Sequence, residues 1–119
     1  HQPDLVQRFV DASILGCVNY LYGDRRAAAA LMKKDNPEMS DEEMEASVAL
    51  MKQLGIVDSG EALTQGMGAM NAARIADFHA QMVKAGLYQP GEVDVSRVAT
   101  LKFVNRQVGV AQKAQLSKR

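Results

Sequence analysis

Apolar residues recur at three- and four-residue steps along the first part of the chain, a spacing typical of one face of an amphipathic helix. The pattern predicts a helix over residues 3–22, with Pro3 at an early helical position and Asp4 near the positive end of the helix dipole. Gly23 suits a left-handed cap after this helix, and Asp24 can cap the next one. The apolar stripe, which needs a partner surface, consists of Val6, Phe9, Val10, Ile14, Cys17, Val18 and Leu21.

Two further helices are predicted over residues 25–34 and 40–54. The first contains a run of four alanines, which has high helix propensity. The second starts with the sharpest local signal in the chain, because Ser40 fits the cap position of a capping box and Glu43 can reach back to the Ser40 amide. Gly55 supplies its end. Its apolar face consists of Met44, Val48, Met51 and Leu54.

The hydrophobic pattern is less regular in the second half of the chain. A long helix is predicted over residues 65–85 and ends at Gly86. Gly66 and Gly68 weaken its start, either by permitting a close backbone approach or by leaving the first turn loosely formed. Alternating apolar residues over 95–103 indicate a helical turn followed by a brief extended segment.

Length and composition limit the fold class. A chain of 119 residues with 47% hydrophobic and 24% charged residues has an ordinary globular composition and room for one domain, here mainly α. The polar residues 112–119 are expected to form a frayed or partly disordered tail. The formal net charge is zero, so no global electric field recruits nucleic acid or an anionic membrane.

The residues that commonly bind metals are few and far apart in the sequence. A histidine and cysteine zinc site would have to use His1, His79 and Cys17, so no metal site is expected. Cys17 is interpreted as a small buried apolar residue on a helix, and His79 as a half-buried or solvated helix histidine rather than a catalytic base.

Three other clusters have ordinary structural explanations. The carboxylates of residues 41–43 fit the first turn of a helix, where they cap it and complement its dipole. Arg25 and Arg26 fit a solvated surface near a helix start. The run Gly66-Met67-Gly68 lacks the third glycine and the lysine of phosphate-binding loops. The sequence therefore predicts no catalytic residue, no cofactor and no enzyme activity.

Six short segments carry a further signal through their order and spacing. They are PDLVQRFVDAS at 3–13, YLYGD at 20–24, KKDNPEM at 33–39, GIVDSG at 55–60, MVKAG at 82–86 and FVN at 103–105. Together these segments resemble the carboxy-terminal part of ABC-importer solute-binding proteins, in the group related to nitrate, sulfonate and taurine binders. The match covers about residues 3–105, and it departs from similar sequences at Cys17, where they tend to have an aromatic residue.

The resemblance implies a type II periplasmic-binding-protein fold, in which two α/β lobes close around a solute. Residues 1–105 would form a four-helix carboxy-terminal segment of it without the central sheets, and residues 106–119 a polar tail. The full-length parent would bind a small nitrogen- or sulfur-containing solute outside the cytoplasm, in the periplasm where there is one, and deliver it to an ABC permease. The segment alone is not expected to bind solute, and no ligand-binding residue is carried over.

Two alternatives to a transport protein stay open. The same family includes proteins of thiamine-pyrimidine synthesis, so the chain could be an enzyme segment, or it could be a freestanding helical interaction or dimerisation module. Helices whose apolar stripes lack their usual cover are also expected to pair with other copies, so a homo-oligomer is predicted for the isolated segment.

Overall fold

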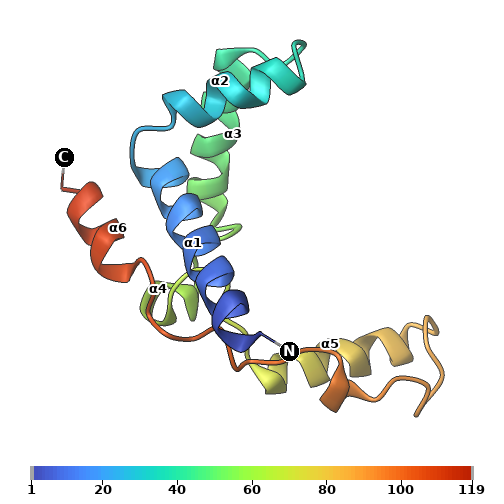
Figure 1. Ribbon diagram of the computed structural model, residues 1–119. Coiled ribbons are helices and arrows are strands. Elements are labelled where there is room, and N and C mark those ends of the chain that lie inside the picture. The colour runs from blue at the N-terminus through green and yellow to red at the C-terminus, as the bar shows by residue number, and fades with distance from the viewer. Residues whose placement is uncertain (1, 119) are drawn as a thin grey trace.

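The computed structural model describes residues 2–118 and is mainly α, as predicted (Figure 1). Within these residues there is no β-strand. The elements in chain order are α1 (Pro3–Tyr22), α2 (Arg26–Asp35), α3 (Asp41–Leu54), α4 (Ala62–Gln65), α5 (Ala72–Lys84), the 3₁₀ turn η1 (Val95–Arg97) and α6 (Val110–Leu116).

The local signals at the start of α1 and at both ends of α3 are confirmed. Helix α1 has Pro3 in its first turn. At the start of α3 the Glu43 amide donates to Ser40 Oγ at 3.2 Å, and the Ser40 amide donates to the Glu43 carboxylate at 2.9 Å. This reciprocal pair is the capping box. Gly55 ends α3 with a φ of +61°, the left-handed conformation that glycine adopts without steric cost.

The end of α1 differs from its prediction. Gly23 has a φ of −104°, so it is extended and does not form a left-handed cap. The reason lies in Arg25, whose guanidinium donates to the carbonyl oxygens of Tyr20 and Leu21 at 2.8 and 3.2 Å. These side-chain bonds satisfy the last carbonyls of the helix in place of a left-handed turn. Asp24 was also expected to cap the next helix, but Arg25 stands at the cap position of α2 and makes no side-chain capping hydrogen bond, while the Asp24 carboxylate accepts the Arg26 amide at 3.1 Å.

The prediction of one helix over residues 65–85 is wrong. The chain breaks at Gly66 and Gly68, which have φ values of +98° and +78°, and α5 begins only after Asn71, whose side chain accepts two amide hydrogen bonds. A Cβ atom at Gly66 would lie 2.8 Å from the Val108 carbonyl oxygen. The close backbone approach considered for this glycine is therefore present, and it explains the break.

Part of the segment expected to be a frayed or partly disordered tail is helical. Residues 110–116 form α6, which packs against α1 and α4 (Figure 1). Gly109 has a φ of +78° and lies against Val18, so the chain can turn closely across α1 there. Leu116 then packs against the core, which gives this polar segment an apolar anchor.

The core is small and lies around the carboxyl-terminal half of α1. Its fully buried apolar residues are Val18, Leu21, Met44, Val48 and Met67. The amino-terminal half of the predicted α1 stripe is uncovered, and Phe9 is 73% exposed there. Cys17 is exposed as well, which corrects its interpretation as a buried residue.

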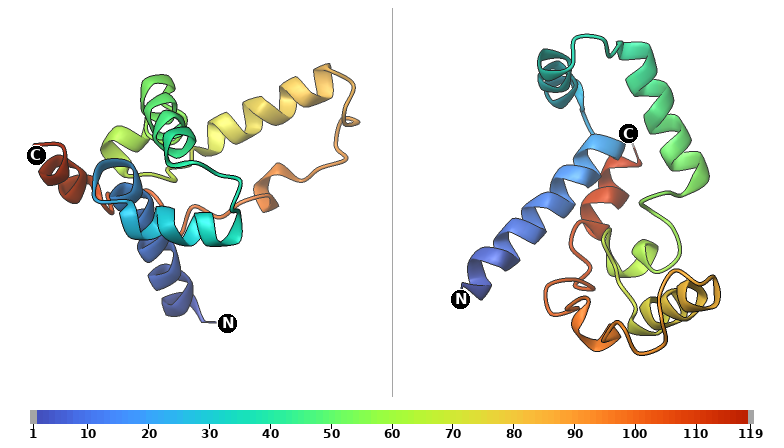
Figure 2. Two further views of the ribbon diagram at one scale, coloured as in Figure 1. Left: turned by 90° about the horizontal axis from the view of Figure 1, so that it is seen from above. Right: turned by 90° about the vertical axis from the view of Figure 1, so that its right-hand side faces the viewer.

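The helices form an open arrangement in which α5 projects from the rest of the chain (Figure 2). The radius of gyration is 17.3 Å, whereas a compact domain of this length has about 13.5 Å. We call residues 71–104 the α5 arm. Its base is held by Asn105, whose side-chain amide donates to the Met70 carbonyl at 2.8 Å and accepts the Met70 amide at 3.0 Å. The arm is thus one excursion of the chain that begins and ends at the same place.

The close approach at Gly66 leads to a test with a matched control. Gly66→Ala should lower the free energy of unfolding by more than about 1 kcal/mol, because alanine is strained at this φ and its Cβ meets the Val108 carbonyl. Gly16→Ala, in α1 with nothing within 4 Å of a new Cβ, should raise it by about 0.5–1 kcal/mol. Urea unfolding followed by circular dichroism measures both, and effects of equal sign would contradict the proposed crossing.

Candidate functional site

A hollow lies between α1, the turn after α3 and the start of α5. It has a volume of about 410 Å³. Its apolar lining consists of Ile14, Ile56, Val57, Ala62, Met67 and Ala69, and its polar and small lining of Ser13, Cys17, Ser59, Glu61, Gly68 and Arg74. An apolar floor with a few polar groups at the edge is the usual composition of a binding site.

A second hollow of about 310 Å³ continues from the first onto α5. The two share Ala69 and Arg74, and the second adds Met70, Asn71, Ile75 and Phe78. We call the lining of both hollows together the α1–α5 groove. Ile56 and Phe78 in this groove are 64% and 62% exposed, so large apolar side chains are in contact with solvent there.

The rim of the groove carries charges of both signs. Arg74 Nη1 lies 3.9 Å from Glu61 Oε2, and the Glu61 carboxylate also accepts a hydrogen bond from Asn71 at 2.6 Å. The Arg74 side chain is 75% exposed, so its attraction to Glu61 is weakened by water. Both groups therefore stay accessible to a molecule that enters the groove.

A second cluster of side chains links the end of α1 to α6 and to the turn after α3. Asp58 has a side chain only 5% exposed, and its Oδ2 accepts a hydrogen bond from Tyr22 Oη at 2.5 Å and pairs with Lys113 Nζ at 2.5 Å. The ammonium groups of Lys52 and Lys113 lie 4.9 and 5.1 Å from the centre of the Tyr22 ring, within the range of a cation–π interaction. This Tyr22–Asp58 cluster connects α1, α3, α6 and the turn after α3.

The surroundings of Tyr22 keep its phenol protonated. Burial raises the pKa of Tyr22 to about 12, and the hydrogen bond to Asp58 and the negative charge of that carboxylate act in the same direction. A phenol with this pKa donates its hydrogen bond throughout the neutral range and is a poor general acid or base there. The cluster is thus suited to holding the fold rather than to moving protons.

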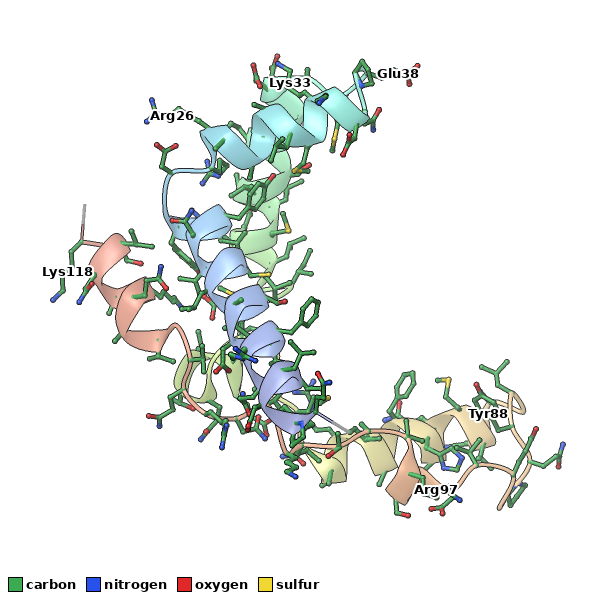
Figure 3. All side chains as sticks on the ribbon, in the orientation of Figure 1. Arg26, Lys33, Glu38, Tyr88, Arg97 and Lys118 are labelled. Atoms are coloured by element: carbon green, nitrogen blue, oxygen red, sulfur yellow. The ribbon has the colours of Figure 1, made fainter. Side chains whose placement is uncertain are left out.

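Three of the basic and acidic candidates from the sequence, Arg25, Arg26 and Asp41, line one hollow of about 540 Å³ between α2 and α3. Arg26 and Lys33 lie on α2, far from Tyr88 and Arg97 on the α5 arm (Figure 3). Arg25 pairs with both oxygens of Glu45, at 2.8 and 2.6 Å. Arg26 pairs with Asp24, which lowers the pKa of Asp24 to about 2. Arg25 and Arg26, which were predicted to lie together on a solvated surface, therefore belong to two separate ion pairs.

The carboxylates of residues 41–43 act in capping and in a surface ion pair. The Glu43 carboxylate accepts bonds from the Ser40 amide and hydroxyl, which lower the pKa of Glu43. Asp41 pairs with Lys33 at 3.0 Å. The structural explanation of this patch is confirmed by these contacts.

The remaining candidates are placed apart from one another. His79 is half-buried on α5, as predicted, and its ring centre lies 6.2 Å from that of Tyr88. Met67 between the two glycines is buried in the core. His1 lies outside the described residues. Among residues 2–118, no group of three or more histidine, cysteine and acidic residues could hold a metal ion.

Sequence reasoning missed the Tyr22–Asp58 cluster. Asp58 was noted only within the segment GIVDSG at 55–60, and Lys113 lies in the segment expected to be frayed or partly disordered. Tyr22 and Asp58 are 36 positions apart, and no helical or turn spacing connects residues at that separation. The only sequence signal for the groove is the apolar stripe of α1. It indicates that one face of the helix must be covered, but not which part of the chain covers it.

Comparison with known proteins adds no relative: no protein-family model, curated protein or solved structure matches the chain. Among residues 2–118, no helix combines the length and the apolar character needed to cross a membrane. The function of the candidate site therefore has to be inferred from the geometry of this chain alone.

The buried ion pair should matter more than an exposed one. Asp58→Asn should lower the free energy of unfolding by about 1.5–3 kcal/mol, because Lys113 loses its partner in a poorly hydrated place. Asp41→Asn, which breaks the exposed pair with Lys33, should cost less than about 1 kcal/mol. Thermal and urea unfolding of the two variants give the comparison, and the reverse order would refute the role of Asp58.

Alkaline pH should weaken the fold through Tyr22. An unfolded tyrosine has a pKa of 10.0, whereas folding raises that of Tyr22 to about 12. The unfolded state therefore releases this proton first, and stability falls as the pH rises from about 10 to about 12. Tyrosinate absorbance should show an ionisation near pH 12 that is missing from Tyr22→Phe and retained in Tyr88→Phe. If Tyr22→Phe leaves the titration unchanged, the assignment is wrong.

Proposed function

We propose that the chain is the helical carboxy-terminal segment of the extracytoplasmic solute-binding component of an ABC importer. In a two-lobe binding protein such helices cover the sheets of a lobe, so they carry apolar faces that need a partner. The observation that carries the proposal is the α1–α5 groove with its exposed apolar side chains, among them Ile56 and Phe78. The six sequence segments that resemble this family support the same conclusion.

The proposal assigns solute capture to the parent protein and a covering role to this segment. The groove is mainly apolar and open, whereas a small nitrate-like or sulfonate-like solute needs several converging donors. On its rim the single guanidinium, Arg74, already lies beside a carboxylate. The solute of the parent is therefore a small nitrogen- or sulfur-containing molecule held mainly by residues outside this chain, and the partner of the complex is the ABC permease.

One observation favours a second function, a freestanding helical interaction module. The Tyr22–Asp58 cluster ties α6 to α1, so the chain closes a small core of its own around Val18 and Leu21. A module that folds by itself would then use the groove to bind another protein. The two proposals differ in what happens to solute transport when the gene is altered.

The experiment is uptake of labelled solutes by cells in which the gene for this chain has been deleted. Uptake of at least one member of a panel containing nitrate, taurine, an alkanesulfonate and an aminopyrimidine should be lost and should return with the wild-type gene. Val57→Asp, in the groove, should fail to restore uptake, because it places a charge where an apolar lobe is proposed to pack. Leu31→Glu, 65% exposed on α2, should restore it. Unchanged uptake of the whole panel in the deletion strain would favour the interaction module.

A further inference from the structure

The chain exposes far more surface than a self-contained protein of its size. Its accessible area is 8837 Å², whereas a compact monomer of 12.9 kDa has about 6,300 Å². The excess is about 2,500 Å² per chain, and obligate homodimers bury about 2,000–5,000 Å² in total. The uncovered area is therefore sufficient for a stable interface with a second copy.

The α1–α5 groove is an apolar part of this surface. It runs from α1 to Phe78 on α5, and Phe9 precedes Ser13 of the groove lining by about one helical turn, on the same face of α1. Phe9 and Phe78 are 73% and 62% exposed. Exposed aromatic residues in an apolar patch are the usual anchors of protein interfaces.

The charges of the groove suit pairing with itself. In a two-fold dimer the same patch of both copies forms the interface, so a positive residue on the rim of one copy can face a negative residue on the rim of the other. Glu61 and Arg74 supply one charge of each sign on the rim, and the whole chain has a formal net charge of zero. Two copies therefore approach without net repulsion.

The projecting arm makes the apolar face of each copy reachable by the other. In Figure 3 the end of the arm that carries Tyr88 and Arg97 lies away from α1, α2 and α3. The base of the arm is held by the hydrogen bonds of Asn105 to Met70 and by the side-chain amide of Gln7 in α1, which donates to the Phe103 carbonyl at 3.1 Å. A projection beside an apolar groove forms a surface that a second copy can enter.

We infer that two copies of this 119-residue chain pair through the α1–α5 groove, with the exposed Phe9 and Phe78 as the main apolar contacts. The inference goes beyond the transport proposal and does not rest on it. It needs only that the exposed apolar side chains of the groove leave water when a second copy covers them. If the chain does not pair with itself, the expected result of the uptake experiment is unchanged. If uptake does not depend on this gene, the expected pairing is unchanged.

Light scattering after size-exclusion chromatography of the full chain tests this inference. The wild type should have twice the 12.9 kDa mass of one chain and should dissociate on dilution. Phe78→Glu should raise the dissociation constant at least about tenfold, because it places a charge at one of the main apolar contacts. Leu31→Glu replaces an equally exposed apolar residue on α2, outside the groove, and should leave the dimer intact. Circular dichroism confirms that both variants keep their helices.

The single cysteine gives an independent measurement of the same contact. Cys17 lines the groove and is exposed in one chain, so pairing should slow its reaction with a thiol reagent. Dilution or Phe78→Glu should restore the fast rate, whereas Leu31→Glu should not. A wild-type chain with the mass of one copy at all concentrations would overturn the inference. Pairing or larger assemblies that persist unchanged in Phe78→Glu would overturn it as well.

Discussion

The carboxyl-terminal turn of α1 is the contact on which the rest of the structure depends. Val18 and Leu21 bury their side chains against α3 and the segment after α4, and Tyr22 adds the hydrogen bond to Asp58. Burial of two aliphatic side chains contributes about 3–6 kcal/mol, which is a large part of the stability of a small domain. Because the buried pair of Asp58 and Lys113 fixes α6 on the same turn, this short segment holds together helices from both halves of the chain.

A core confined to one end explains why the candidate site is a surface rather than an enclosed pocket. The apolar residues of α1 continue beyond the core to Phe9, which is 73% exposed. The exposed apolar stripe and the open groove therefore have a common cause, which is a helix longer than the core that receives it. The proposed packing against a lobe of the parent protein and the proposed pairing of two copies both involve this exposed part of α1.

The sequence predicted those features whose cause lies within a few residues. Ser40 and Glu43 form a capping box because four consecutive positions are sufficient to build one. Gly23 was predicted wrongly because Arg25, from the following turn, supplies the hydrogen bonds that a left-handed cap would have supplied. Gly66 and Gly68 indicated a weak helix start, but the carbonyl that approaches Gly66 belongs to Val108, which lies far away in sequence, so the local pattern did not reveal that α4 and α5 are separate helices. For the same reason the sequence predicted that the apolar stripe of α1 needs a partner surface, but not where the groove lies.

The arm closed by Asn105 has a consequence for how the length of this protein can vary. Its two ends, Met70 and Asn105, are 35 positions apart in the chain but are joined by two hydrogen bonds. Because these bonds close the base of the arm, we expect a change of length at the turn around Gly91 to affect the part of the fold beneath it less than the loss of Asn105 does.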